Sequence, residues 1–277
     1  MKFSLILCTV NREIEVKELL DSLVRQTFKH FEVIVVDQNQ DDRIKLLLLE
    51  YECLNIVYLQ SDLGLSKARN VGLKYYTGDI VCFPDDDCIY PQELLHNVNQ
   101  YFLLESYDIL MGKTIDENSY QIVAGKNITT RQKLSTFYTL GSSTTLFVRR
   151  SSDIEFDEQF GLGSIFGAEE ENDLVFRLLK RGYTGYYNPS INYVFHPPSD
   201  LDFSDLGRVK SRAIGLGAFI AKHLFTAEGA FYFIKFNIIR PLFGCLLFLF
   251  LLDLKKSNFY LNRWIGIWKG FIGYMLK

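Results

Sequence analysis

Short apolar runs alternate with segments of helical spacing through the first 83 residues, and this alternation restricts the fold more than any other feature. Apolar runs of strand length occupy residues 3–8, 31–37, 56–59 and 79–83. Between these runs, the apolar residues of 13–27, 44–49 and 66–76 recur at helical spacing. Buried strands that alternate with helices are typical of parallel sheets covered on both faces. We therefore predict an α/β fold with a doubly wound, mostly parallel sheet.

The pattern is less regular from residue 105 onward. We expect strands at 109–115 and 144–149, a short helix at 174–181 and closing strands within 184–196. The segment 160–167 contains three glycines in eight residues, so we expect a flexible loop there.

Residues 207–277 differ from the rest of the chain. They contain eleven Lys or Arg but only two Asp or Glu, although the whole chain has a net charge of −3. The uncharged apolar run 241–252 has 12 residues, fewer than the roughly 20 that span a bilayer. Trp264 and Trp268 lie near Lys and Arg residues, as in helices that lie in the headgroup layer. We predict a helical, membrane-associating segment with shallow insertion of 241–252. The alternative is that this run packs on the rest of the protein.

Composition restricts the class of protein and its compartment. A hydrophobic fraction of 48% excludes an intrinsically disordered chain. The five cysteines form no CxxC pair, and their odd number indicates a reduced cytoplasmic chain with buried thiols. Charged residues follow the N-terminal apolar run at once, so we interpret this run as a strand rather than a signal peptide.

Polar side chains follow the predicted strands at the points where these strands end. They are Thr9, Asn11, Arg12, Asp37, Asp85, Asp86 and Asp87. Ligands of doubly wound sheets bind at the carboxyl ends of the strands. We therefore expect these side chains to converge on one nucleotide-binding crevice.

The three adjacent carboxylates within residues 83–91 are the strongest local signal. On an extended turn, Asp85 and Asp87 face the same side and repel each other unless a cation joins them. Mg²⁺ or Mn²⁺, bound by carboxylates together with phosphate oxygens and water, meets this requirement. The alternative is an ordinary solvated acidic turn.

Two further signals lie later in the chain. Glu169, Glu170 and Glu171 precede a predicted helix, where acidic residues are favoured by the helix dipole. A carboxylate at this place can also act as the base that takes a proton from an acceptor hydroxyl. His196 ends a strand before two prolines, and it is either a structural histidine or a ligand of metal or phosphate.

These signals, in this order, resemble the family 2 glycosyltransferases of the GT-A fold. Five segments carry the resemblance: 5–12, 34–37, 63–72, 78–87 and 167–182. The family's Val-Asp-Asp-Gly-Ser turn is replaced here by a turn that keeps only its first Asp, Asp37. The family's Glu-Asp pair reads Glu170 and Glu171.

The resemblance implies an inverting, metal-dependent transfer from a nucleotide-sugar, with UDP as the usual nucleotide. Thr9, Asp37 and Arg69 are similar to positions that hold the nucleobase. Asp85 resembles the position that contacts the ribose, and Asp87 resembles the metal ligand that bridges the diphosphate.

The remaining implied roles concern catalysis. Glu171 falls where the family has its base, with Glu170 as the second assignment. His196 resembles a late histidine near the metal and diphosphate, so the implied ligands of Mn²⁺ or Mg²⁺ are Asp85, Asp87 and His196. No covalent intermediate is expected, because a single displacement needs no nucleophilic residue.

The resemblance also suggests a division of the chain. Residues 1–206 form a GT-A catalytic domain, with a nucleotide-binding half at about 1–100 and an acceptor-binding half at about 101–206. Residues 207–277 form the membrane-associated segment. We expect a cytoplasmic enzyme peripheral to the inner leaflet, acting on a lipid-linked or cell-surface glycan precursor, without a nucleic-acid partner.

Two other classes of protein remain open. A non-catalytic nucleotide-sugar-binding or scaffold protein with the same fold would bind nucleotide without turnover. A nucleotidyltransferase would carry a glycine-rich phosphate loop after the first strand, but residues 9–13 contain no glycine.

Overall fold

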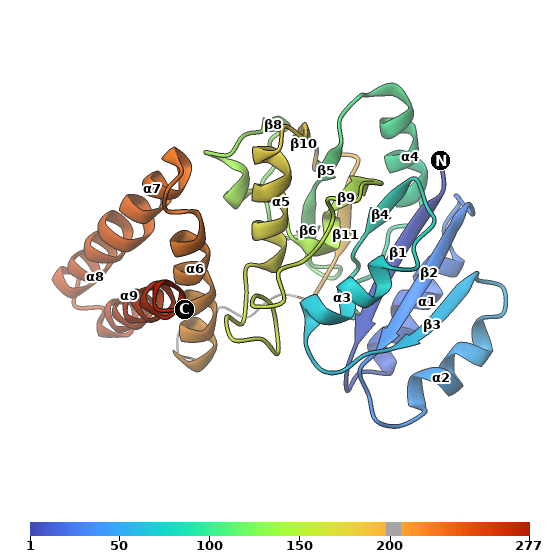
Figure 1. Cartoon of the computed structure of the whole chain (residues 1–277), viewed down its shortest axis with the longest axis horizontal. Coiled ribbons are helices and arrows are strands. Elements are labelled where there is room, and N and C mark those ends of the chain that lie inside the picture. The colour runs from blue at the N-terminus through green and yellow to red at the C-terminus, as the bar shows by residue number, and fades with distance from the viewer. Residues whose placement is uncertain (198–205) are drawn as a thin grey trace. The chain divides into compact units, whose positions relative to one another are not determined.

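The computed structural model describes residues 1–197 and 206–277 (Figure 1). The chain divides into two compact units. Unit 1 contains Met1–Phe156 and continues from Leu174, and unit 2 contains Asp157–Asp173 and the C-terminal helices. The boundary between the units falls within helix α5 (Glu170–Lys180).

Unit 1 is built on an eight-stranded sheet with the order β3-β2-β1-β4-β9-β5-β10-β8. The strands are β1 (Phe3–Thr9), β2 (Phe31–Asp37), β3 (Ile56–Gln60), β4 (Ile80–Cys82), β5 (Ile109–Met111), β8 (Thr130–Gln132), β9 (Phe147–Arg149) and β10 (Gly185–Tyr187). The pairs β1/β2, β1/β4, β2/β3 and β5/β10 are parallel. Strand β9 pairs antiparallel with β4 and β5, and β8 pairs antiparallel with β10. The predicted α/β fold with a mostly parallel sheet is confirmed.

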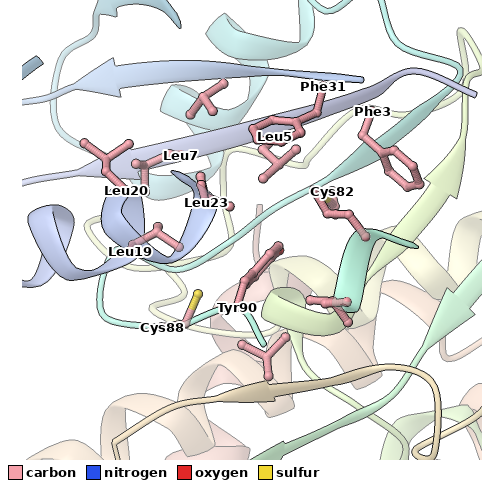
Figure 2. Packing of buried hydrophobic residues seen from close by; sticks show 14 of the residues in the cluster. Phe3, Leu5, Leu7, Leu19, Leu20, Leu23, Phe31, Cys82, Cys88 and Tyr90 are labelled. Carbon is pink, nitrogen blue, oxygen red and sulfur yellow. The ribbon is translucent and has the colours of Figure 1, made fainter. Parts of the chain in front are cut away.

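Helices cover both faces of this sheet. Leu5 and Leu7 of β1 belong to the main core with α1 (Ile14–Val24) and α4 (Leu94–Leu104) (Figure 2). On the opposite face, α3 (Leu65–Leu73) packs so closely that a Cβ on Gly72 would lie 2.6 Å from Ile6 Cγ2. Alternate residues of one fully buried strand therefore support two layers of helices.

Several expected elements differ from the structure. The strand expected at 109–115 is two strands, because β5 ends at Met111 and β6 (Lys113–Ile115) joins a small sheet with β7 (Ile122–Ala124) and β11 (Tyr193–Phe195). Gly112 separates the two strands. The backbone of Asn192 approaches it so closely that a Cβ there would lie 1.6 Å from Asn192 O. Helix α4 was not expected at all.

The glycine-rich segment expected to be a flexible loop is held by hydrogen bonds within unit 2. Gly161 and Gly163 adopt positive φ values of 95° and 80°. The Ser164 hydroxyl lies within hydrogen-bonding distance of three backbone oxygens, those of Gln159, Gly161 and Phe166. The segment is therefore an ordered turn, and glycine supplies the backbone conformations that it needs.

The helices of unit 2 are α6 (Leu206–His223), α7 (Ala227–Phe233), a π-helical turn (Ile234–Ile239), α8 (Arg240–Phe250) and α9 (Leu254–Met275). Helices α6 and α9 lie so close together at Gly217 that a Cβ atom there would lie 1.9 Å from Ile267 O.

The helical stretch Ala227–Phe250 has 24 residues, twice the apolar run seen in the sequence, and is long and apolar enough to span a membrane. Core helices of soluble proteins can be equally long and apolar, although only 22% of this window is buried.

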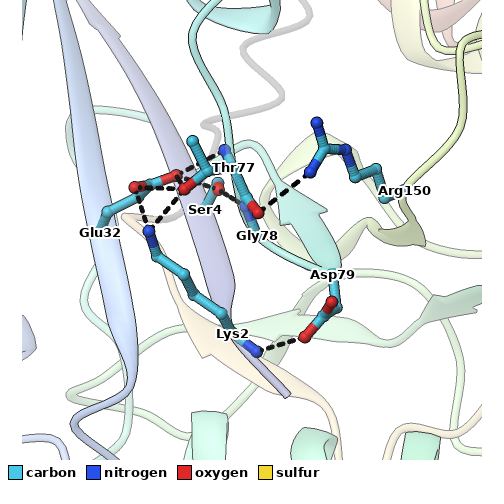
Figure 3. Close-up of polar contacts among 7 residues, drawn as sticks. All are labelled: Lys2, Ser4, Glu32, Thr77, Gly78, Asp79 and Arg150. Carbon is cyan, nitrogen blue, oxygen red and sulfur yellow. Dashed lines mark hydrogen bonds and ion pairs between the residues drawn. The ribbon is translucent and has the colours of Figure 1, made fainter.

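A buried carboxylate joins the amino ends of the central strands in unit 1 (Figure 3). Glu32 of β2 accepts hydrogen bonds from Lys2 Nζ (2.5 Å), Ser4 Oγ (2.6 Å) and Thr77 N (2.8 Å). Gly78 N donates to Ser4 Oγ, and a Cβ on Gly78 would lie 2.8 Å from the Phe3 carbonyl carbon. Burial raises the pKa of Glu32, but these hydrogen bonds outweigh burial and lower it from 4.5 to about 2.

We expect Glu32→Gln to lower the free energy of unfolding at pH 7 by about 2 kcal/mol, because it removes charged hydrogen bonds at a buried site. Since the pKa of Glu32 is depressed in the folded state, its stabilisation is complete above pH 4.5 and is lost as the pH falls toward 2. Urea unfolding of both proteins between pH 7 and pH 3 should show their difference shrinking. Glu50→Gln, at an exposed ion pair with Lys17, is the control and should leave this profile unchanged. A difference that stays constant with pH would contradict the assignment.

Candidate active site

Polar residues from the carboxyl ends of β1 and β4 meet in unit 1. Thr9 Oγ1 donates to Asp86 Oδ2 at 2.8 Å, and Arg12 NH1 lies 2.5 Å from Asp86 Oδ1 and 2.6 Å from Asp87 Oδ2. These contacts arise because β1 and β4 are parallel neighbours whose ends lie side by side. The structure thus brings Thr9 and Arg12 together with the acidic turn, as the sequence predicts.

Asp85, Asp87 and His196 form a group that suits a divalent cation. One donor atom from each of the three lies within 4.8 Å of the others. His196 follows β11, and its Nδ1 lies 2.7 Å from the Pro197 carbonyl oxygen. A proton on Nδ1 directed to this carbonyl leaves the Nε2 lone pair for a metal. Two carboxylates and one imidazole are a donor set appropriate to Mn²⁺, and the carboxylates are appropriate to Mg²⁺.

The charged groups of this cluster change one another's pKa values. Burial raises the pKa of Asp86, and its hydrogen bonds from Thr9 and Arg12 offset only part of that rise. Burial also raises the pKa of Asp87, but His196 and Arg12 outweigh burial, so this pKa is lowered. For His196, burial lowers the pKa and the nearby Asp87 raises it, with a net rise. Such coupled shifts are typical of functional sites.

Arg69 of α3 contacts the same cluster through Asp85. Its side chain is buried, with the guanidinium over the rings of Phe83 and Phe156, and NH2 lies 3.1 Å from Asp85 Oδ1. The neighbouring Asn70 exchanges two hydrogen bonds of 2.8 Å with the backbone of Phe156. Arg69 and Asn70 therefore fix the position of Asp85 and of the segment beside it.

Asp37 lies at the neighbouring strand end and supports a turn rather than the acidic cluster. Its buried carboxylate accepts hydrogen bonds from Asn39 N (2.9 Å), Asn39 Nδ2 (2.7 Å) and the Tyr58 hydroxyl (3.0 Å). The side-chain Oδ1 of Asn39 in turn accepts a hydrogen bond from the backbone N–H of Asn11, which has a φ of 58°. Asn39 thus closes the turn that departs from the family's pattern, and sequence reasoning missed it.

Sequence reasoning also missed Ser143, whose hydroxyl donates to Asp85 Oδ1 at 3.3 Å. Ser143 begins a 3₁₀ turn (Ser143–Thr145) that overlaps the start of the strand expected at 144–149. No local pattern indicates such a contact, because 58 residues separate the two partners.

Glu170 and Glu171 lie in the first turn of α5, with Glu170 buried and Glu171 partly buried. Glu169 precedes the helix with a φ of 78° and accepts a hydrogen bond from the Asn172 side chain. This turn is where sequence reasoning expects the base.

A buried charge network holds this turn within unit 2. Asp173 is fully buried, and its Oδ1 lies 2.8 Å from Lys222 Nζ and 2.9 Å from His223 Nε2, both of α6. Lys222 Nζ also lies 2.6 Å from Asp157. The sequence pattern singled out the acidic run but gave no indication of these partners.

Together, the sheet and the carboxylate group at its edge define an α/β protein with a candidate metal centre. The sequence profile of the family described as Glycosyl transferase family 2 matches residues 4–153, which is more than half of the chain. The chain belongs to this family, as the resemblance predicts.

Known relatives and structures agree with this family. The poly(ribitol-phosphate) beta-N-acetylglucosaminyltransferase TarS of Staphylococcus aureus (strain MW2) is 31% identical over 176 residues, covering 57% of this chain and 30% of TarS. The chain spans about a third of the length of the curated relatives that it matches first.

Two solved structures share the fold. The crystal structure of S. aureus TarS 1-349 in complex with UDP-GlcNAc has a TM-score of 0.59 at 20% identity, covering 98% of this chain and 92% of that one. The mannosyltransferase PcManGT of Pyrobaculum calidifontis, in complex with GDP-Man and Mn²⁺, has a TM-score of 0.65 at 15% identity, covering 99% and 87%. At these identities the likeness establishes the fold alone.

We expect Lys222→Met to lower the free energy of unfolding by about 3 kcal/mol, because it removes a cation from the fully buried Asp173. Urea unfolding followed by circular dichroism would measure the loss. Lys269→Met, on the exposed side of α9, is the matched control and should change stability little. Equal losses in the two variants would contradict a structural role for the Asp173 network.

Proposed function

We propose that this protein is an inverting glycosyltransferase that moves a sugar from a UDP-sugar to a hydroxyl of a lipid-linked or cell-surface glycan precursor. The observation that carries the proposal is the group Asp85, Asp87 and His196, whose donor atoms lie within 4.8 Å of one another at the ends of the strands. Membership of glycosyl transferase family 2 supports the same class of reaction.

In this proposal, each residue of the cluster has a defined task. Asp85, Asp87 and His196 hold Mn²⁺ or Mg²⁺, which when bound offsets the negative charge on the departing diphosphate. Arg12 and Arg69 orient the carboxylates that they contact. In this proposal, Asp85 also contacts the ribose of the donor nucleotide.

The nucleobase is assigned to the adjoining strand ends. The family resemblance assigns nucleobase binding to Thr9, Asp37 and Arg69, whose buried side chains support the strand ends and the turn that carries Asn11. The Asn39 bridge keeps this turn in place, since it joins the buried Asp37 to the backbone of Asn11.

Catalysis by the chain itself needs one base. Glu171 accepts the proton of the acceptor hydroxyl as that oxygen attacks the anomeric carbon from the face opposite the leaving group. A carboxylate oxygen thus gains the proton, and the single displacement inverts the configuration. Glu171 is favoured over Glu170 because it is the more exposed of the two.

The choice of donor is supported by the relatives. TarS is named as an N-acetylglucosaminyltransferase and has been crystallised with UDP-GlcNAc. UDP-GlcNAc is therefore the first donor to test, with GDP-Man as the comparison because PcManGT binds it.

We place the protein at the cytoplasmic face of the membrane, attached through residues 207–277. The exposed apolar side chains of α8 and the excess of Lys and Arg in this segment support that location. Recovery of all the protein in the soluble fraction of cells lysed at low salt would contradict it.

We expect the purified protein to release nucleotide slowly from one nucleotide-sugar in the presence of Mn²⁺, and EDTA to abolish this release.

Asp87→Asn should abolish metal-dependent donor binding, measured by calorimetry, because it removes a charged ligand. Asp153→Asn, at a surface ion pair with Arg181, is the control and should bind as the wild type does. Metal-dependent binding without release or transfer would instead support the non-catalytic binding protein.

We expect Glu171→Gln to reduce sugar transfer by about 10²- to 10⁴-fold, because the amide cannot accept the proton. Donor affinity should not change, since the base acts on the acceptor. Parallel assays of Glu170→Gln discriminate between the two glutamates. A larger loss in Glu170→Gln would move the base to that residue, and full transfer by both variants would exclude this turn as its source.

A further inference from the structure

An open groove lies on the surface of unit 2 between α8 and α9. Its volume is about 440 Å³, and its lining residues are Lys235, Ile239, Arg240, Phe243, Gly244, Leu247, Phe248 and Tyr260. We call this the α8 groove. Gly244 is part of its wall, and the Tyr260 ring packs so closely there that a Cβ on Gly244 would lie 2.5 Å from it. Ile239 and Phe243 are 60% and 68% exposed, so the apolar side of the groove faces outward.

Two cations line the α8 groove, and both lie near the same aromatic ring. Lys235 Nζ lies 5.3 Å and Arg240 Cζ lies 5.9 Å from the centre of the same ring, that of Phe236. The π-helical turn Ile234–Ile239 carries Lys235 and Phe236 and leads directly into Arg240. Such turns interrupt α-helices, and they occur frequently at functional sites.

The charge of the groove selects its occupant. Two of its eight lining residues are cations, and none of these described residues is acidic. Two cations beside the apolar lining match a molecule with an anionic group at one end and a hydrocarbon chain at the other. A second copy of this chain is a poorer match, because residues 207–277 carry a large excess of positive charge and would repel each other.

The same cations oppose a transmembrane orientation of Ala227–Phe250. A span of this stretch would place Lys235 and Arg240 near its middle, where charges in hydrocarbon are costly. An orientation in the plane of the interface avoids this cost, because the cations then lie among headgroups while Phe243 and Leu247 enter the acyl region.

We propose that the α8 groove binds a single anionic membrane phospholipid. Lys235 and Arg240 contact its phosphate, and Phe243, Leu247 and Phe248 contact one acyl chain. The inference rests on the proposed attachment of residues 207–277 to the membrane and makes it specific for one class of headgroup.

The two tryptophans of the chain provide a built-in probe of this site. Trp264 Nε1 donates a hydrogen bond to Asn237 O at 2.8 Å, inside the π-helical turn, and Trp268 packs against Phe233. Bromine atoms on acyl chains quench tryptophan fluorescence at short range. Titration of the full chain with vesicles of brominated phosphatidylglycerol therefore reports a lipid next to this turn, and brominated phosphatidylcholine is the neutral comparison.

We expect phosphatidylglycerol vesicles to quench the fluorescence and phosphatidylcholine vesicles to do so only weakly. The double variant Lys235→Gln/Arg240→Gln should bind phosphatidylglycerol about 30-fold more weakly, given the contribution of each cation near an anionic surface. The control Lys45→Gln/Lys74→Gln removes two exposed cations from unit 1 and should bind as the wild type does.

Three outcomes would overturn the proposal. The first is equal quenching by the two lipids in the wild type, a comparison that does not depend on the folding of any variant. The second is equal binding by the double variant and the wild type. The third is a dimer in sedimentation that Lys235→Gln/Arg240→Gln dissociates, without lipid quenching, which would assign the groove to a second copy.

Nucleotide release without lipid, measured on the same preparations, separates this proposal from the transferase function. If metal-dependent nucleotide release is normal but the protein binds both lipids equally, only the proposed lipid site is contradicted. Specific lipid binding without release or donor binding would support the lipid site and contradict the proposed transferase.

Discussion

The parallel pairing of β1 with β2 on one side and with β4 on the other is the constraint on which the site depends. Because the three strands run in the same direction, their carboxyl ends lie at one edge of the sheet. The residues that follow them can then touch, as Thr9 and Arg12 do with Asp86. Full burial of β1 keeps this arrangement fixed, since both of its faces are covered by helices.

The sequence predicted those parts of the fold that depend on local patterns. Apolar runs located β1, β2 and β4, and Thr9 and Arg12 lie close to Asp86 as expected, whereas Asp37 supports a neighbouring turn. Contacts between distant segments left no such pattern, so Ser143 beside Asp85 and Lys222 beside Asp173 were missed. The break at Gly112 was missed for the same reason, because it depends on the close approach of Asn192.

The proposed metal site rests on geometry as well as on sequence pattern. Asp85, Asp87 and His196 come from separate places in the chain, yet their donor atoms gather within 4.8 Å. Arg12 contacts Asp86 and Asp87, and Arg69 is buried beside Asp85, so cations of the chain itself hold the acidic turn in place. The assignment of the base to Glu171 stays a prediction, since it derives from the family resemblance and from the greater exposure of this residue.

The network around Glu32 lies at the amino ends of the strands, whereas the acidic cluster lies at their carboxyl ends. The anchoring network and the candidate metal site are thus formed by different residues at opposite ends of the same strands. Substitutions around the acidic cluster can therefore accumulate while the other end keeps the strands in register. A scaffold of this kind can diversify its chemistry over evolutionary time without first losing its fold.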